Sequence, residues 1–282
     1  MVISLVMMQI NLHLNSPLLA IFHRWLRWFV FAFGTAQFSI EFDWIDRPFW
    51  VLVVVFFITW FLGETLMNWL AISAHSLSPI PLFPRYTVNN SGEEWPVQPR
   101  LLKVREWLRS QGFRQVQALK AEIAPAVFLR VSIYEDAQAT VRVQITFIPQ
   151  ANGAISICFG VMSCLSDGRR IVTDNLYLPF AGFYPENWLV ERDPCCRSLS
   201  RLQERHRRRL LKTQNPVQPF SVDPLTDLNA IQRELDQLNT ELGFLHPHQQ
   251  REDLGKFTQE GRYRVWKEIW TLNYLGRAAS YE

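Results

Sequence analysis

The chain has 282 residues, with 29 Lys and Arg against 26 Asp and Glu, and a formal net charge of +3. This length accommodates a membrane anchor, one domain of roughly 100–150 residues and some further helices. The positive charge is concentrated in residues 197–212, where seven cations accompany one carboxylate, and the rest of the chain is net acidic. The composition therefore excludes a protein that is basic throughout and leaves one basic segment to explain.

Residues 1–72 are predicted to form a membrane anchor. Residues 48–63 carry no charge, and 66–72 continue the apolar run. About 20 helical residues cross the hydrocarbon of a bilayer. A second span near 18–40 would hold Arg24 and Arg27 at one end, where long side chains reach the interface. We favour a transmembrane hairpin with spans near 18–40 and 48–72, and the alternative is a single span with an interfacial helix.

The charges around these spans predict the topology. The connector EFDWIDR is acidic, whereas Arg24 and Arg27 precede it and further cations follow the second span. The positive-inside rule then places both termini and the soluble domain in the cytoplasm, in a multi-pass protein of the plasma or inner membrane. The first residues contain no Lys or Arg and no small-residue cleavage site, so a removable secretory signal is not expected.

Glu64 is the one ionisable residue between Arg47 and His75, and Asn68 follows it by four positions on the same helix face. Carboxylates inside a membrane are costly and usually functional. If the span ends near residue 63, however, Glu64 marks only the membrane interface. Both interpretations remain open, and in either the bilayer or the subunits of a membrane complex are the expected partners.

Residues 73–99 read as a linker, because five prolines interrupt any long helix there. Residues 100–212 then read as an α+β domain. A helix over 100–110 is followed by alternating apolar and polar residues that predict strands at 127–134, 140–148, 154–165 and 170–178. Asn152-Gly153 and Asp167-Gly168 predict type I′ hairpin turns. The expected fold is a four-stranded antiparallel meander covered on one face by helices.

The basic segment predicts a helix over residues 198–212. Its cations fall into one stripe at helical spacing: Arg201, Arg205, Arg208 and Lys212. The stripe is either a solvated outer face or a ridge that binds anionic lipid or an acidic protein. Nucleic acid is disfavoured, because no aromatic residues stand between the cations to stack on bases.

Candidate catalytic groups are few. His206 lies on the apolar side of the basic helix, where a core histidine is the simpler interpretation, and Asp174 or Cys195 are the residues that could complete a catalytic group. No GxSxG, HExxH, P-loop or paired CxxC motif occurs, so neither a cofactor nor a metal is expected. The four cysteines are expected to be free thiols, and Cys195-Cys196 is also a possible acylation site.

Residues 213–282 are predicted to form a C-terminal helical extension. Residues 228–242 carry a leucine stripe of about two heptads, which could pack on the domain or support self-association. A final helix beginning near Thr258 presents aromatic residues that could lie on a bilayer or cap the core. The sequence as a whole predicts a non-enzymatic scaffold or regulatory protein acting at the cytosolic membrane surface through its basic helix. The alternative is a membrane-tethered hydrolase that uses His206 with a nearby carboxylate or thiol.

Overall fold

The computed structural model describes residues 6–7, 9–11, 16–91, 95–96, 98–149 and 155–279. The chain divides into two compact units. The helical unit comprises Met1–Ser78, Pro179–Ala181 and Gln250–Glu282, and the sheet unit comprises Pro79–Leu178 and Gly182–Gln249. The last residues of the chain therefore belong to the same unit as the first helices.

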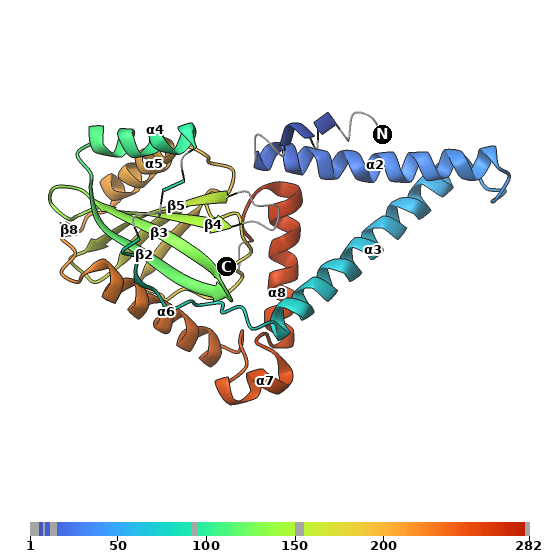
Figure 1. The fold of residues 1–282 in the computed structure, drawn as a ribbon. Helices are drawn as coiled ribbons and strands as arrows, with labels where there is room; N and C mark the ends of the chain where they lie inside the picture. Colours follow the sequence, from blue (N-terminus) through green and yellow to red (C-terminus); the bar gives the residue numbers. More distant parts are fainter. Residues whose placement is uncertain are drawn as a thin grey trace. The chain divides into compact units, whose positions relative to one another are not determined.

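The helical unit is built from two long helices and a shorter C-terminal one (Figure 1). Its elements are α2 (Pro17–Glu41), α3 (Phe49–Leu77), α7 (Arg251–Leu254), α8 (Gln259–Trp270) and the π-helical turn η2 (Thr271–Leu275). Ala32 and Ala36 of α2 form a buried cluster with Leu52 and Val53 of α3, because small side chains let two helices approach closely. Thr258 caps α8 by accepting a hydrogen bond from the Gly261 amide, which confirms the predicted start of the last helix.

Among the described residues, α3 is the one helix long and apolar enough to cross a membrane. It has 29 residues, and its most apolar 18-residue window has a mean hydropathy of 2.0 with only 11% of the window buried. It ends at Leu77, so it continues beyond the span predicted at 48–72. The helix α2 does not meet the same criterion. A transmembrane hairpin, a multi-pass topology and a cytoplasmic orientation therefore stay predictions.

Among the residues that the structure describes, the sheet unit contains eight strands and three α-helices. The strands are β1 (Thr87–Val88), β2 (Arg114–Ala124), β3 (Val127–Glu135), β4 (Arg142–Pro149), β5 (Ile155–Leu165), β6 (Arg170–Asp174), β7 (Trp188–Arg192) and β8 (Val217–Gln218). The helices are α4 (Pro99–Ser110), α5 (Leu199–Lys212) and α6 (Pro224–Glu241), followed by the 3-10 turn η1 (His248–Gln250). Strands β1 to β7 lie in sequence order, and β8 pairs with β5. All pairs are antiparallel except β6 with β7, so the sheet is mixed.

The predicted α+β class is confirmed, but the four-stranded meander is only the centre of the sheet. The four predicted strands are present as β3 to β6, and they pair consecutively. The strand β2 was missed because residues such as Ala, Lys and Glu in its LKAEIA segment favour helices, although Leu119 and Ala121 alternate as inward-facing residues. The last predicted strand ends at Asp174 instead of residue 178, because the side chain of Asn175 bonds to the Phe159 amide and the Cys196 carbonyl.

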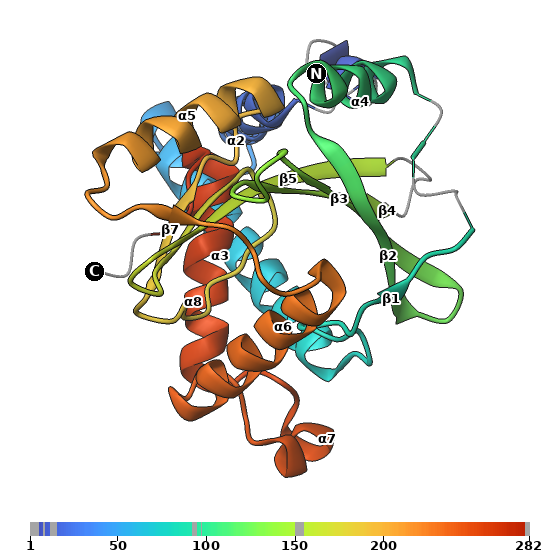
Figure 2. The same cartoon turned by 90° about the vertical axis from the view of Figure 1, so that its left-hand side faces the viewer.

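Helices cover both faces of the sheet, where the sequence predicted one covered face (Figure 2). On one face α4 and α5 contribute Leu101, Leu108, Leu199 and Leu202 to a core with Val143, Ile145 and Phe159. On the other face Leu228 of α6 packs with Leu119, Val131 and Ile133. Adjacent strand residues point to opposite faces, so both clusters follow from one alternating pattern.

A buried ion-pair network joins α6 to the sheet. Asp227, in the first turn of α6, accepts from Arg142 at 2.6 Å and from Arg170 at 2.9 Å. Arg142 is 2% exposed and also bonds to Glu135 at 2.7 Å. The helix itself begins at Pro224, and Asp223 caps it by accepting a hydrogen bond from the Thr226 amide. Periodicity alone gives no indication of this network, because its members are far apart in sequence.

The two predicted hairpin turns have different outcomes. In the β5–β6 turn only Gly168 has a positive φ, of +82°, and its amide donates to the Leu165 carbonyl. The turn is therefore not type I′, which needs positive φ at two residues, but a longer loop with one left-handed glycine. Asn152-Gly153 lies outside the described residues. The strands on either side still pair as expected, with Pro149 opposite Ile155.

Candidate functional site

The basic helix α5 lies on the sheet through its apolar side and exposes its cations. Leu199, Leu202 and His206 are its buried residues. The four residues of the predicted stripe, Arg201, Arg205, Arg208 and Lys212, are all exposed. Ser198 caps the helix by accepting from the Arg201 amide. The predicted separation of an apolar and a basic side is therefore present in the structure.

Neighbouring carboxylates neutralise part of this stripe. Arg205 pairs with Asp193 at 2.6 Å, and Arg208 pairs with Glu204 at 2.9 Å. Hydrogen bonds from Arg207 and Arg208 lower the pKa of Glu204 to about 2. Arg201 and Lys212 make no ion pair with any residue that the structure describes. The stripe keeps a net positive charge, although a smaller one than the sequence suggests.

Arg209, which lies outside the stripe, has a structural role that the sequence does not reveal. Its guanidinium donates to the Val172 carbonyl at 2.6 Å, to the Thr173 hydroxyl at 2.7 Å and to the Leu189 carbonyl at 2.6 Å. These acceptors belong to β6 and β7, the parallel pair of the sheet. One cation of the basic segment therefore holds the end of the sheet together and is not available to a partner.

His206 is a buried, neutral histidine between two hydroxyl groups. It is 1% exposed, its Nδ1 lies 3.0 Å from Thr173 Oγ1, and its Nε2 lies 3.1 Å from Ser163 Oγ. Burial and the nearby Arg209 charge lower its pKa from 6.5 to about 3. Its hydrogen bonds within the described part of the chain use both ring nitrogens. This geometry corresponds to a satisfied core histidine.

The other candidate catalytic residues have separate surroundings. Asp174 pairs with Arg192 at 3.0 Å and accepts a hydrogen bond from the Leu176 amide. Burial raises the pKa of the Cys195 thiol, with a smaller contribution from Asp193. The two ring nitrogens of His206 bond instead to Thr173 and Ser163. No group of three or more His, Cys, Asp or Glu that could hold a metal ion occurs among the described residues.

Glu64 lies near the middle of α3 and accepts hydrogen bonds from three aromatic side chains. Its Oε2 atom is 2.8 Å from the Trp28 indole nitrogen and 3.1 Å from that of Trp60, and it also accepts from the Tyr274 hydroxyl. These donors come from α2, α3 and η2. The Nδ2 atom of Asn68, predicted to share this face, is buried without a hydrogen-bond partner among the described residues. The sequence identified Glu64 but gave no sign of its partners.

Aromatic side chains surround this carboxylate. The Trp28 ring lies 4.6 Å from Phe57, and Trp270 lies 4.8 Å from Tyr274, measured between ring centroids. Trp25 of α2 also contacts Tyr274, at 5.3 Å. The aromatic side of the last helix therefore packs on α2 and α3 within the helical unit. Sequence periodicity found these rings but left their partner undetermined.

The leucine stripe of α6 is largely used within its own unit. Leu228, Ile231 and Leu235 are buried, whereas Leu242 is 52% exposed. Most of the apolar side is therefore already covered. Self-association through residues 228–242 stays a prediction that the structure does not test.

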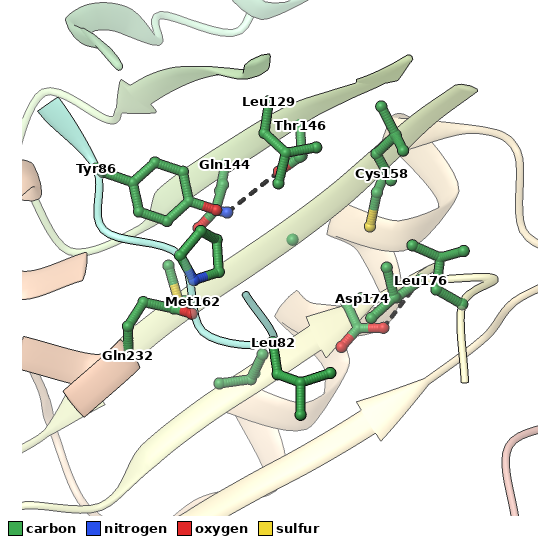
Figure 3. A pocket seen from close by; sticks show the side chains of 15 residues that line it. Leu82, Tyr86, Leu129, Gln144, Thr146, Cys158, Met162, Asp174, Leu176 and Gln232 are labelled. Atoms are coloured by element: carbon green, nitrogen blue, oxygen red, sulfur yellow. Dashed lines mark hydrogen bonds between the residues drawn. The ribbon is translucent and has the colours of Figure 1, made fainter. Parts of the chain in front are cut away.

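A cavity of about 300 Å³ lies on the α6 face of the sheet and was not anticipated from the sequence (Figure 3). In Figure 3, Leu82 and Tyr86 from the segment before β1 face Cys158 and Asp174 of β5 and β6. Most lining side chains are apolar, and the polar ones are few. The polar residues in the alternating pattern of β4 include Gln144 and Thr146, and both line the cavity.

Comparison with models of protein families, with curated proteins and with solved structures finds no match. Three features of this chain bear on its function: the exposed apolar surface of α3, the cationic stripe of α5 and the cavity on the sheet.

Proposed function

We propose that the protein is a membrane-anchored, non-enzymatic interaction protein whose anchor is α3. The observation that carries this proposal is the exposure of large apolar side chains along the helix: Trp50 is 66% exposed, Val54 56% and Ile58 51%. Soluble proteins rarely leave so long an apolar surface in water, because its burial is strongly favourable. The hydrocarbon of a bilayer is the environment that suits it.

The surface of α2 supports a hairpin anchor. Phe22 and Phe38 are each 59% exposed, and Phe29 is 49% exposed, so apolar side chains also face outward along α2. Arg24 and Arg27 lie toward its first residues, whereas the connector to α3 carries three acids and one Arg. By the positive-inside rule this arrangement favours two spans, with both termini and the sheet unit in the cytoplasm.

The interaction itself is proposed to occur through α5. Arg201 and Lys212 have no carboxylate partner among the described residues, and the compensated Arg205 and Arg208 remain exposed beside them. Each cation near an anionic membrane surface contributes about 1 kcal/mol of attraction. The anionic headgroups of the cytosolic leaflet are therefore the proposed partner of the stripe.

Carbonate extraction tests the anchor. The protein should remain in the membrane fraction, because insertion depends on apolar area and not on charge. Replacing both Val54 and Ile58 by Asp should lower the inserted fraction, since a carboxylate at the centre of a span costs about 2.5–3.5 kcal/mol. The matched control replaces Val88 and Val116, two exposed valines of the sheet unit, by Asp and should change nothing. Release of the unaltered protein by carbonate would refute the anchor.

A separate experiment tests the stripe. The full chain is placed in phosphatidylcholine nanodiscs, and its binding to phosphatidylserine vesicles is measured by co-sedimentation. Binding should weaken between 0.1 M and 0.5 M salt, because the Debye length falls well below its ~10 Å value at 0.1 M. Changing Arg201, Arg205, Arg208 and Lys212 to Gln should abolish binding.

The control for this variant removes the same charge elsewhere. Lys103, Arg109, Arg114 and Arg233 are exposed cations of the sheet unit outside α5. Their replacement by Gln should leave vesicle binding close to that of the unaltered protein. Equal losses in the two variants would show that only net charge matters, and the assignment of the interaction to α5 would then be wrong.

A further inference from the structure

The cavity in the sheet unit has the construction of a binding site. It lies over the centre of β5, where Gly160 has no side chain to fill the space. A Cβ atom at Gly160 would approach only Gln144, at 3.9 Å, so nothing in the packing requires a glycine there. The cavity has a volume of about 300 Å³. An apolar cavity of roughly 150 Å³ already holds benzene, so this space suits a somewhat larger molecule.

The wall formed by Tyr86 is fixed by α6. The side chain of Asn229 accepts a hydrogen bond from the Tyr86 amide at 2.8 Å and donates to the Tyr86 carbonyl at 3.0 Å. The Tyr86 ring packs on Leu119 and Val131 of the sheet. Both contacts hold the ring in one position before any ligand arrives, and preorganisation of this kind reduces the entropy cost of binding.

The Tyr86 hydroxyl makes no hydrogen bond to a described residue, and although Tyr86 is only 6% exposed, its oxygen atom remains accessible. Burial raises its pKa above the usual value, with a smaller effect from Cys158, so the group is a neutral hydroxyl that can donate and accept. A hydroxyl or carbonyl group of a ligand in the cavity would form a hydrogen bond with it in place of solvent.

The charge of the cavity favours a neutral ligand. Among the described residues that line the cavity, Asp174 is the one carboxylate, and it is paired with Arg192 at 3.0 Å. Burial raises the pKa of the Cys158 thiol, which keeps it protonated. A charged ligand would enter a largely apolar space without a free counter-ion, and burial of an unpaired charge is strongly unfavourable.

We propose that the cavity between Tyr86 and β5 binds a small, uncharged and mainly apolar molecule whose hydroxyl or carbonyl group bonds to Tyr86. Its size is about ten to twenty non-hydrogen atoms. This site goes beyond the proposed membrane function and does not depend on the anchor, because every residue in the argument belongs to the sheet unit.

The test uses 2-naphthol as the probe, with the full chain in phosphatidylcholine nanodiscs and empty nanodiscs as the reference for lipid partitioning. Probe fluorescence should report saturable binding. Naphthalene, which lacks the hydroxyl, should bind about fivefold more weakly, as expected for one hydrogen bond. The anion 2-naphthoate should bind at least tenfold more weakly. Absence of saturable 2-naphthol binding, or equal binding of 2-naphthoate, would overturn the proposal.

Two variants locate the site. Gly160→Leu should fill the cavity and abolish binding of 2-naphthol and of naphthalene. The control, Gly34→Leu, adds the same side chain to α2, where no atom lies within 4 Å of the added Cβ, and this variant should bind both compounds normally. Tyr86→Phe should remove the fivefold preference for 2-naphthol over naphthalene and leave naphthalene binding unchanged. Unaltered binding by Gly160→Leu, or an unaltered preference in Tyr86→Phe, would refute the assignment.

A measurement on the unaltered protein covers the case in which Gly160→Leu does not fold. Saturating 2-naphthol should slow amide exchange in residues 82–88 and in β5, because the ligand joins the two walls of the cavity. Exchange in α4, on the opposite face of the sheet, should not change. If 2-naphthol slowed amide exchange elsewhere in the chain but not in residues 82–88 and β5, the proposed site would be wrong.

Discussion

The indole nitrogen of Trp28 lies 2.8 Å from the carboxylate of Glu64, and this bond joins α2 to α3 across 36 residues of sequence. The same oxygen accepts from Trp60 and from the Tyr274 hydroxyl, so one atom connects three parts of the helical unit. A carboxylate that would be costly in an apolar setting is here satisfied by donors that themselves belong to aromatic rings. Glu64 therefore links α2, α3 and η2 within the helical unit.

Replacement of Glu64 by Leu is expected to destabilise the helical unit by several kcal/mol, because three donors lose their acceptor. Glu64→Gln should lose less, since its amide oxygen can still accept. Thermal unfolding in detergent, followed by tryptophan fluorescence, measures the difference. Thr59→Leu is the control, because Thr59 is exposed and bonds only within its own helix. Equal melting temperatures for Glu64→Leu and Thr59→Leu would contradict this role.

Asp227 is expected to be the most sensitive carboxylate of the sheet unit. Asp227→Ala leaves Arg142 and Arg170 without their shared partner, and removal of one member of a buried ion pair typically costs about 3–5 kcal/mol. Denaturant unfolding of the sheet unit checks this. Asp223→Ala, four residues earlier, removes only a helix cap and should cost about 1 kcal/mol. A smaller effect at Asp227 than at Asp223 would exclude the network as a stabilising element.

Arg208 and Arg209 are adjacent in the sequence, but their replacement is expected to lower the stability of the sheet unit by different amounts. Arg209→Gln loses hydrogen bonds to acceptors on β6 and β7 and should destabilise the sheet unit by about 1.5–3 kcal/mol. Arg208→Gln removes the same charge from an exposed ion pair and should cost less than about 1 kcal/mol. The midpoint of urea unfolding distinguishes them. If both variants shift it equally, the contacts of Arg209 contribute nothing beyond charge.

His206 predicts a specific pH dependence of stability. Its pKa is about 3 in the folded protein against an ordinary value of 6.5, so the unfolded chain binds the proton more readily. The contribution of this histidine is therefore complete above pH 6.5 and is lost as the pH falls toward 3, by at most about 1.4 kcal/mol per pH unit. Amide exchange in β5 and β6 measures this loss.

The corresponding variants separate His206 from other histidines. His206→Gln should flatten the pH dependence between 6.5 and 3, since glutamine does not titrate there. His248→Gln removes a histidine that is 66% exposed in its side chain and should leave the dependence as it is. An identical pH profile for His206→Gln and the unaltered protein would mean that other groups cause it.

Local patterns predicted those parts of the fold that depend on neighbouring residues. The alternation in β4 and β5 identified both strands, and the Asp223-Pro224 start of α6 was visible because capping acts within one turn. The strand β2 was not visible, because its helix-favouring residues are held in a strand only by pairing with β3. Propensity is a weak guide where tertiary contacts decide.

The candidate sites, like the secondary structure, were predictable only where the residues concerned are close together in the sequence. The cations of α5 and the carboxylate of Glu64 were identified because each stands out in its own segment. The cavity was not, because its walls combine Tyr86 from a proline-rich segment with Gly160 and Asp174 from the sheet. Folding brings these residues together from distant parts of the chain, and a periodic pattern in the sequence does not indicate such contacts.

The division of the chain into units has a consequence for biosynthesis. The segment Gln250–Glu282 belongs to the helical unit, yet it leaves the ribosome after the whole sheet unit has been made. During that interval Glu64 lacks its bond from Tyr274, and the rings of Trp25 and Trp28 lack the contacts they make with Tyr274 in the finished protein. A chain interrupted after the sheet unit would leave Glu64 with the hydrogen bonds from Trp28 and Trp60 but without the one from Tyr274.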